Sequence, residues 1–526
     1  MTHPSAAGTW AAHQLTLTAE RTYGNPYTDL DVWVDFTHED GTVLRRPAFW
    51  DSGNAFGVRF AAGGRAGRWT WRSHCTTADP GLHGQTGTLE VTDSAPDGNR
   101  FRTHGFWRMS PGRRSVVHAD GFPAVLVADT AWALPWRATP EQARDYAADR
   151  HAKGFNAVLL MSVQPDMHAT GPRDRTADGG FDVAFEDLPG GHINQLNPGY
   201  FQALDTILGV LHEHEIVPVL QPVFFGFGWK GLRVAGPVVP PAEYARYCRY
   251  LVARYGAQPV VYLVGADGTG LEPQVEAGGR EVHQWDCYEQ PTGIHYRPHS
   301  TAAAHQDEPW LDFQWCQTGH EGEHVPERVA VLWSRSPAKA AANGEPTYEN
   351  SGRTGKASGW WQGHEAWSNL CAGGTMGVVY GAGSLWQWAL RPDEPGQEPY
   401  FLAPSCGWRE ALDFEGSRYV GMVGRILDGL LTTDMRPDWE SVIAPRGLTV
   451  PGALHVVYLE GPRGLRVTDP AGLPRCYTIF DPRDGTVLSK GEWASQQGSR
   501  GSIIDPPDQP SVIVFTNEPM GRWAAG

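Results

Sequence analysis

The chain has 526 residues, which is more than one ordinary domain holds, so the sequence predicts two or three domains. Hydrophobic residues make up 41% and charged residues 19%, a balance that indicates folded domains with apolar cores and excludes a largely disordered chain. The formal net charge of −16 repels phosphate backbones and anionic lipid surfaces, so we expect neither nucleic acid nor membrane as a partner.

The cysteine usage and the amino end bear on where the protein resides. The 7 cysteines are odd in number and scattered, with no CxxC pair, a pattern typical of reduced thiols and not of a disulfide framework. The first residues show no basic stretch followed by an apolar run, and no segment reaches about 18 uninterrupted apolar residues. We therefore predict a cytoplasmic protein without a membrane span.

Both ends of the chain show β patterning. In residues 1–97, segments such as Asp31–Phe36 and Trp69–Arg72 alternate apolar and polar positions, and clusters of Gly, Asp and Pro separate them. Residues 439–526 show the same pattern, for example at Leu454–Leu459 and Ser511–Phe515. Period two with frequent turns predicts a β-sandwich at the amino end and a small β-sandwich at the carboxy end.

Residues 98–438 differ, because short apolar runs alternate with amphipathic helical stretches, one of which begins at Thr139 as N-cap with Pro140 in the first turn. This alternation predicts an α/β fold, a (β/α)₈ TIM barrel. A doubly wound open sheet is the main alternative, and it is disfavoured because no glycine-rich turn follows the first strand. The eight predicted strands are Phe122–Asp129, Phe155–Met161, Ile216–Pro222, Val260–Asp267, Gly293–Tyr296, Leu311–Trp315, one that ends at Glu345, and Gly377–Gly381.

Three acids stand at the predicted strand ends: Asp129 after the first strand, Asp267 after the fourth and Glu345 after the seventh. In a parallel barrel, side chains at these ends meet at one face, and the fourth and seventh strands lie across the barrel mouth from one another. Hydrolysis of a glycosidic bond needs one carboxyl to protonate the leaving oxygen and a second, ionised carboxylate on the other side of the sugar. We predict these roles for Asp267 and Glu345, with Glu349 of the same loop as a rival for the second. Each acid could instead be a helix cap or part of a salt bridge.

Aromatic and histidine side chains crowd the same loops. The chain has 22 Trp, whose flat faces can stack on sugar rings or pack in cores; Trp132 and Trp386 are candidates for sugar contact. The histidines match no HExxH or paired Cys/His spacing, so we predict no metal and no cofactor, and expect hydrogen bonds to sugar hydroxyls instead. No GxSxG or GxxxxGK[ST] motif is present, which disfavours esterase and nucleotide chemistry. The clustered histidines are His295, His299, His305, His320 and His324.

Several motifs in their order along the chain resemble those of apiosidase-like glycoside hydrolases. The resemblance covers nearly the whole chain, and the Gly-Glu-Pro-x-Tyr-Glu motif is its most specific part. The matching stretches are Tyr23–Tyr27, Phe49–Gly53, Gly67–Trp71, Ala128–Trp132, Lys153–Asn156, Val264–Asp267, Trp310–His320, Gly344–Glu349, Val379–Ala382 and Phe480–Gly485.

The resemblance implies a (β/α)₈ glycosidase in which Asp267 is the acid/base and Glu345 the nucleophile or base. It also implies that the substrate contacts Asp129, Trp132, Gln317, His320 and Tyr348, to which the loop positions of Glu349 and Trp386 add two candidates. One departure concerns Ala266, which stands where the family usually has a second glycine before the acid, so altered specificity is expected there.

We therefore expect an exo-acting glycoside hydrolase that uses two carboxylates on a small glycoside or oligosaccharide. A carboxyl separation of about 5 Å would indicate retention of configuration, and about 6.5–9.5 Å inversion. Two alternatives stay open: a non-catalytic carbohydrate-binding protein on a degenerate barrel, and a metal-dependent hydrolase that uses the histidine cluster. The sugar, its anomeric configuration and the oligomeric state are left open by the sequence.

Overall fold

The fold is taken from a computed structural model of the chain. It describes residues 7–93, 98–226, 233–300, 302–320, 324–350, 359–394, 405–438, 442–443, 446–461, 465–467, 473–492, 503–504 and 508–521. Within these residues, no helix combines the length and the apolar character that crossing a membrane would require.

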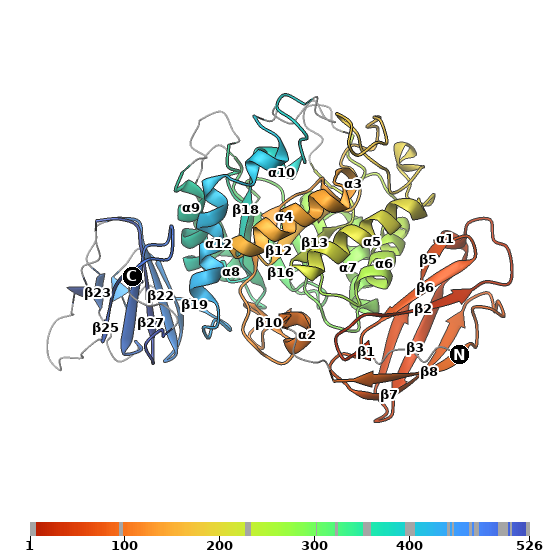
Figure 1. Cartoon of the computed structure of the whole chain (residues 1–526), viewed down its shortest axis with the longest axis horizontal. Helices are drawn as coiled ribbons and strands as arrows, with labels where there is room; N and C mark the ends of the chain where they lie inside the picture. The colour runs from red at the N-terminus through yellow and green to blue at the C-terminus, as the bar shows by residue number, and fades with distance from the viewer. Residues whose placement is uncertain are drawn as a thin grey trace.

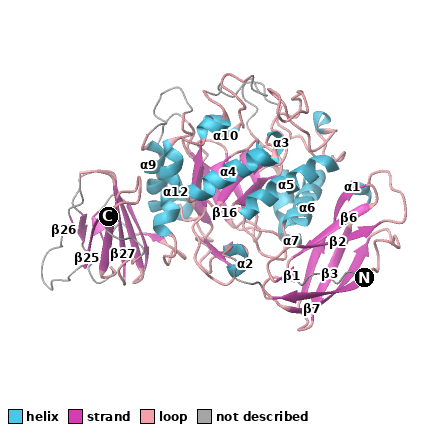
Figure 2. Cartoon of the chain, viewed as in Figure 1, coloured by secondary structure: helices cyan, strands magenta, loops and turns pink. Residues whose placement is uncertain are grey.

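The centre of the molecule is an eight-stranded parallel sheet in the order β17-β16-β15-β14-β13-β12-β11-β18, rolled into a nearly closed barrel (Figure 2). The predicted (β/α)₈ barrel is therefore confirmed. The strands are β11 Val127–Thr130, β12 Ala157–Met161, β13 Val217–Gln221, β14 Val261–Gly268, β15 Thr292–Tyr296, β16 Phe313–Gln317, β17 Ala340–Glu345 and β18 Val378–Gly381.

The first strand is shorter than predicted. The stretch Phe122–Leu126 was expected to belong to it, but β11 begins only at Val127. The carbonyl of Phe122 instead accepts a hydrogen bond from His118 N, and Pro123 bridges to Val117. These contacts fold the stretch back on strand β10, Val116–His118, and proline has no N–H to give to a sheet ladder.

Helices cover the outside of the barrel (Figure 1). Helix α4 begins as predicted, since Thr139 and Gln142 form a reciprocal capping box and Pro140 occupies the first turn. The helices of this region are α3 Leu134–Arg137, α4 Pro140–Lys153, η1 Leu188–Gly190, α5 Pro198–Glu213, α6 Pro241–Tyr255, α7 Pro273–Trp285, α8 Glu327–Trp333, α9 Trp361–Cys371, α10 Gly383–Trp386, α11 Trp408–Ala411 and α12 Glu415–Leu427.

Alternation along the strands divides the core into two layers. On β11, Ala128 belongs to the cluster inside the barrel, whereas Val127 belongs to the cluster between the strands and the helices. On β12, Leu159 points inward and Val158 outward in the same way. The parity of a residue on its strand therefore decides whether its side chain reaches the interior of the barrel or the helix layer.

Sheets that are mostly antiparallel flank the barrel at both ends of the chain, as predicted (Figure 1). The amino-terminal sheets have the orders β1-β8-β7-β3-β4 and β2-β6-β5. Their strands are β1 Ala7–Gly8, β2 His13–Thr18, β3 Val32–His38, β4 Val43–Pro47, β5 Phe49–Ser52, β6 Ala55–Phe60, β7 Gly67–Cys75 and β8 Thr86–Thr92. Helix α1 is Pro26–Asp29, and α2 Arg100–His104, β9 Trp107–Met109 and β10 Val116–His118 lead into the barrel.

The carboxy-terminal sheets have the orders β19-β21-β22-β27-β24-β25 and β20-β23-β26. The first strand of these sheets, β19, lies just before the predicted domain boundary at 438/439. The other predicted domain boundary, at 97/98, adjoins residues 94–97, which are outside the described residues. Both boundaries stay predictions. The strands are β19 Arg436–Pro437, β20 Val442–Ile443, β21 Arg446–Val450, β22 Leu454–Leu459, β23 Leu465–Val467, β24 Cys476–Phe480, β25 Val487–Glu492, β26 Ile503–Ile504 and β27 Ser511–Thr516.

A glycine contact sets how closely α12 packs on α4. A Cβ added at Gly421 would lie 2.1 Å from the carbonyl oxygen of Lys153, whereas a Cβ at Gly209 in α5 would meet nothing within 4 Å. We expect Gly421→Ala to lower the free energy of unfolding by about 1–3 kcal/mol, because backbone must move apart. Gly209→Ala should be neutral or raise it by up to about 1 kcal/mol. Urea denaturation of both variants tests this, and equal stabilities would contradict it.

Candidate active site

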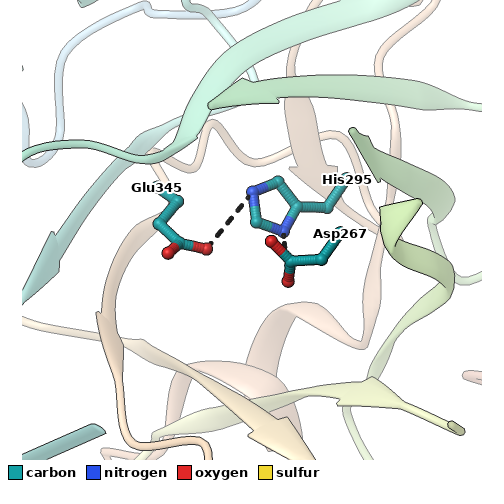
Figure 3. A group of neighbouring side chains, drawn as sticks. All are labelled: Asp267, His295 and Glu345. Carbon is teal, nitrogen blue, oxygen red and sulfur yellow. Dashed lines mark ion pairs between the residues drawn. The ribbon is translucent and has the colours of Figure 1, made fainter. Parts of the chain in front are cut away.

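Three side chains meet at the carboxyl ends of the fourth, fifth and seventh strands: Asp267 of β14, His295 of β15 and Glu345 of β17. Figure 3 shows the imidazole between the two carboxylates. The distances are 3.9 Å from His295 Nδ1 to Asp267 Oδ2 and 3.7 Å from His295 Nε2 to Glu345 Oε2. One oxygen of each acid and a ring nitrogen all lie within 4.8 Å of one another. The structure thus brings the two predicted catalytic acids together.

The backbone of β14 is irregular where it presents Asp267. Its pairing with β15 shifts register twice, once on each side of Gly265 and Ala266, and Asp267 itself adopts φ +60°, a left-handed conformation that is uncommon outside glycine. Such bulges re-aim a side chain, and strain of this kind concentrates at functional sites. Ala266, the departure from the family pattern, is fully buried in the cluster inside the barrel.

The two acids have opposite pKa shifts. Burial raises the pKa of Asp267 well above its usual range, and the neighbouring charge of Glu345 adds to this. Burial also acts to raise the pKa of Glu345, but the hydrogen bond from His320, with a contribution from Gln317, holds that pKa below its usual value. These opposite shifts favour the proton on Asp267 and the ionised form of Glu345.

His320 and Tyr348 hold one oxygen of Glu345. His320 Nε2 lies 2.9 Å from Glu345 Oε1, and the backbone N–H of Tyr348 donates to His320 Nδ1 over 3.3 Å. Because Nδ1 accepts this bond, the ring proton is on Nε2, which donates to Glu345. The other oxygen of Glu345, Oε2, is buried and has no hydrogen-bond partner within the described part of the chain. It is the oxygen available for chemistry.

Other predicted substrate-contacting residues surround this group. Trp132 Nε1 donates to the hydroxyl of Tyr348 over 3.2 Å, and the Trp132 ring stacks on His295 at 6.3 Å. Tyr348 in turn lies 6.3 Å from the ring of Trp386. Gln317 is paired in register with Glu345, and its side chain interacts with both catalytic acids. Their contacts with a substrate stay predictions.

The structure does not bring Asp129 and Glu349 to this group, and their predicted contacts with a substrate stay predictions. Asp129 follows the inward-facing Ala128 on β11, so it points into the helix layer, where Tyr146 and Arg150 donate to its Oδ2 over 2.9 and 2.6 Å.

Glu349 is directed away in the same manner. Its Oε2 accepts from the hydroxyl of Tyr380 over 2.6 Å and from Gly416 N over 2.9 Å. Glu349 N also donates to the carbonyl of Gly381, which ties the loop to β18. The rival for the second carboxylate role is therefore engaged in the outer layer of the barrel.

The histidine cluster does not assemble as one site. His299 pairs with Arg328, His305 with the carbonyl of Gly270, and His324 lies against His364. Among the described residues, only Asp267, His295 and Glu345 come together as a possible metal-binding group. One ring nitrogen of His295 and one oxygen of each acid lie within 4.8 Å of one another, so the metal-dependent alternative applies to this group and not to the other histidines.

His295 is the site residue that sequence reasoning did not select. The sequence placed it in a loop cluster of histidines, although the predicted strand Gly293–Tyr296 already contained it. The signal that could have found it is the strand end itself, because the fifth strand ends at the same face as the fourth and seventh.

Two close carboxyls with opposite pKa shifts at the strand ends of a parallel barrel form the arrangement that glycoside hydrolysis requires. A family model described as "Apiosidase-like, catalytic domain" matches residues 110–433. The match covers more than half of the chain, so the chain belongs to this family and is a glycoside hydrolase. A second model, "Domain of unknown function (DUF5060)", matches residues 6–76 in the amino-terminal sheets.

Solved structures share the fold. A putative glycoside hydrolase from Bacteroides vulgatus ATCC 8482 has a TM-score of 0.70 at 16% identity, over 97% of this chain and 99% of that one. A glycoside hydrolase family 5 protein from the same organism has a TM-score of 0.63 at 18% identity, over 79% and 94%. A structure titled "Glycoside hydrolase" has a TM-score of 0.62 at 17% identity, over 79% and 98%. No curated protein matches the chain.

The placement of Asp129 predicts a role in stability. Asp129→Asn removes the fully buried one of the two carboxylates, Asp129 and Asp149, that pair with the buried Arg150, which should lower the free energy of unfolding by up to about 3–5 kcal/mol. Asp35→Asn, which breaks an ion pair with the exposed Arg45, should cost at most about 1 kcal/mol. Urea denaturation measures both, and KM should be unchanged in Asp129→Asn. A raised KM at normal stability would return Asp129 to substrate binding.

Proposed function

We propose that the chain hydrolyses a glycosidic bond with retention of configuration, with Asp267 as the acid/base and Glu345 as the nucleophile. The observation that carries the proposal is the approach of one oxygen of each acid to within 4.8 Å. Retaining glycosidases have carboxyl groups about 5–5.5 Å apart, whereas inverting ones need about 6.5–9.5 Å to admit a water. The opposite pKa shifts of the two acids support the division of roles.

In the first step, Asp267 gives its proton to the oxygen that leaves with the aglycone. Glu345 Oε2 attacks the anomeric carbon from the other side, and a covalent glycosyl-enzyme forms as the bond to the leaving oxygen breaks. His320 holds Glu345 Oε1 throughout, so the free oxygen keeps its direction.

In the second step, Asp267 acts as a base and Glu345 is the leaving group. Esterification removes the negative charge of Glu345. Because this charge is one of the causes that raise the pKa of Asp267, that pKa falls in the glycosyl-enzyme. Asp267 is then a carboxylate that takes a proton from water while the water oxygen attacks the anomeric carbon. Glu345 leaves as a carboxylate, and the second inversion restores the original configuration.

We further propose that the enzyme acts on the end of a small glycoside or oligosaccharide. The side chains of both acids are only 8% exposed, and Trp132 and Tyr348 are buried beside them. Such enclosure favours a single terminal ring over an internal stretch of polymer. Membership of a glycoside hydrolase family and the unpartnered oxygen of Glu345 favour catalysis over the non-catalytic alternative.

Replacement of the nucleophile tests the proposal directly. Glu345→Gln should lower kcat by at least about 10³-fold while the protein stays folded, because an amide cannot form the glycosyl-enzyme. Glu349→Gln is the matched control in the same loop, and it should keep kcat within about 10-fold because its carboxylate faces Tyr380. Steady-state kinetics with circular dichroism measures both. Near-normal turnover by Glu345→Gln would remove the proposed role.

The stereochemical outcome is a second, independent test. A panel of aryl furanosides, aryl pyranosides and disaccharides would identify a substrate, and ¹H NMR would then record the first anomer released. We expect the anomer of the substrate, with turnover unaffected by a chelator. Release of the opposite anomer would replace the covalent step with direct attack by water, and loss of turnover in the chelator would support the metal-dependent alternative.

A further inference from the structure

His295 lies between the two catalytic acids without a hydrogen bond to any residue that the structure describes. The ring is fully buried, and among the described residues neither nitrogen has a hydrogen-bond partner. A buried polar group without a partner is costly, and native structures usually keep one for a reason. Each nitrogen faces one carboxylate, Nδ1 toward Asp267 and Nε2 toward Glu345 (Figure 3).

The donors and acceptors around Glu345 are fixed by a backbone N–H, which can donate a hydrogen bond but cannot accept one. The backbone N–H of Tyr348 can only donate, so His320 Nδ1 must accept and His320 Nε2 must carry the proton. That proton is directed at Glu345 Oε1 and stabilises the ionised form of this carboxylate. The remaining oxygen, Oε2, carries part of the negative charge and faces His295 Nε2.

The same order of donor and acceptor extends across the imidazole of His295. An ionised Glu345 draws a proton to His295 Nε2, and a neutral imidazole with its proton on Nε2 presents a bare lone pair at Nδ1. A lone pair at Nδ1 repels an ionised Asp267 and accepts a hydrogen bond from a protonated one. The ring thus converts the charge of one acid into a preference for the proton on the other.

We propose that His295 is a positioning residue that assigns the catalytic proton to Asp267, as the last link of a one-way chain that starts at the backbone N–H of Tyr348 and runs through His320 and Glu345. This inference rests on the proposed function and adds the physical device that keeps the acid and the nucleophile distinct. No proton leaves His295 in either step of the reaction.

Two further observations support the chain. Burial lowers the pKa of His295 to about 4, so the ring is neutral where the enzyme would work. Its distances to the acids are longer than hydrogen bonds, and catalytic contacts in ligand-free enzymes are commonly long and tighten when substrate binds. The titratable groups around the ring are Asp267, Glu345, His320 and Tyr348, and Trp132 stacks on its face.

The pH profile of kcat/KM tests the proposal. His295→Phe removes the donor to Glu345, which should raise the acid limb, and the acceptor for Asp267, which should lower the alkaline limb. Each limb should move inward by about one pH unit, the effect of one hydrogen bond on a pKa. His295→Gln, whose amide offers both a donor and an acceptor, should restore part of the lost width.

A matched control separates this effect from general damage. His118 is also buried, with its pKa lowered to about 4, but it lies on β10 outside the barrel. His118→Phe should leave the width of the profile unchanged. A His295→Phe profile that falls in height with its limbs unmoved, or that shifts as a whole, would overturn the proposal and leave His295 a packing residue.

The tautomers provide a readout that needs no turnover. In protein labelled with ¹⁵N-histidine, long-range ¹H–¹⁵N spectra at neutral pH should show His295 and His320 protonated on Nε2, with signals assigned by their loss in His295→Phe and His320→Phe. His295 protonated on Nδ1 would overturn the chain even in an active enzyme. Failure of the proposed function would instead appear as a fully active Glu345→Gln variant, so the two failures are distinguishable.

Discussion

Two carboxylates held close together in a nearly buried setting create the constraint on which this site depends. Like charges less than 5 Å apart and shielded from water cannot both ionise without a large cost, so one of the two must carry a proton. The chain resolves this by giving Glu345 a charge-assisted hydrogen bond from His320 and giving Asp267 none of comparable strength. The difference in environment separates an acid from a nucleophile.

The barrel supplies the distance and the irregular strand ends supply the direction. Parallel strands bring residues remote in the sequence to one face, and the register shifts in β14 and at the end of β16 turn Asp267 and Glu345 toward each other. The left-handed backbone of Asp267 is a local cost that the surrounding sheet has to maintain. The rigid barrel thus maintains the strained backbone that orients Asp267.

Asp129 and Glu349, which lie behind the site, stabilise the barrel and do not face the reacting atoms. Asp129 with Arg150, and Glu349 with Tyr380, are buried polar contacts that join the first and last strands and the loop after β17 to the helix layer. Removing one member leaves a charge or a hydrogen-bonding group unsatisfied in an apolar layer. They stabilise the frame in which Glu345 is held, without facing the reacting atoms.

The sequence by itself determined the barrel, the flanking β domains and the two catalytic candidates, because hydrophobic periodicity and strand-end position are local properties of the chain. It also indicated Trp132, Gln317, His320 and Tyr348, which the structure places around those acids.

Only the tertiary structure decided which acids face inward. The side of a strand to which Asp129 points depends on how β11 sits against its neighbours, and Glu349 depends on Tyr380 and Gly416, which come from later parts of the chain. His295 likewise acquires its place between the acids only when three strands close into one barrel. Periodicity fixes the elements, but the orientation of a single side chain is set by contacts between residues far apart in the sequence.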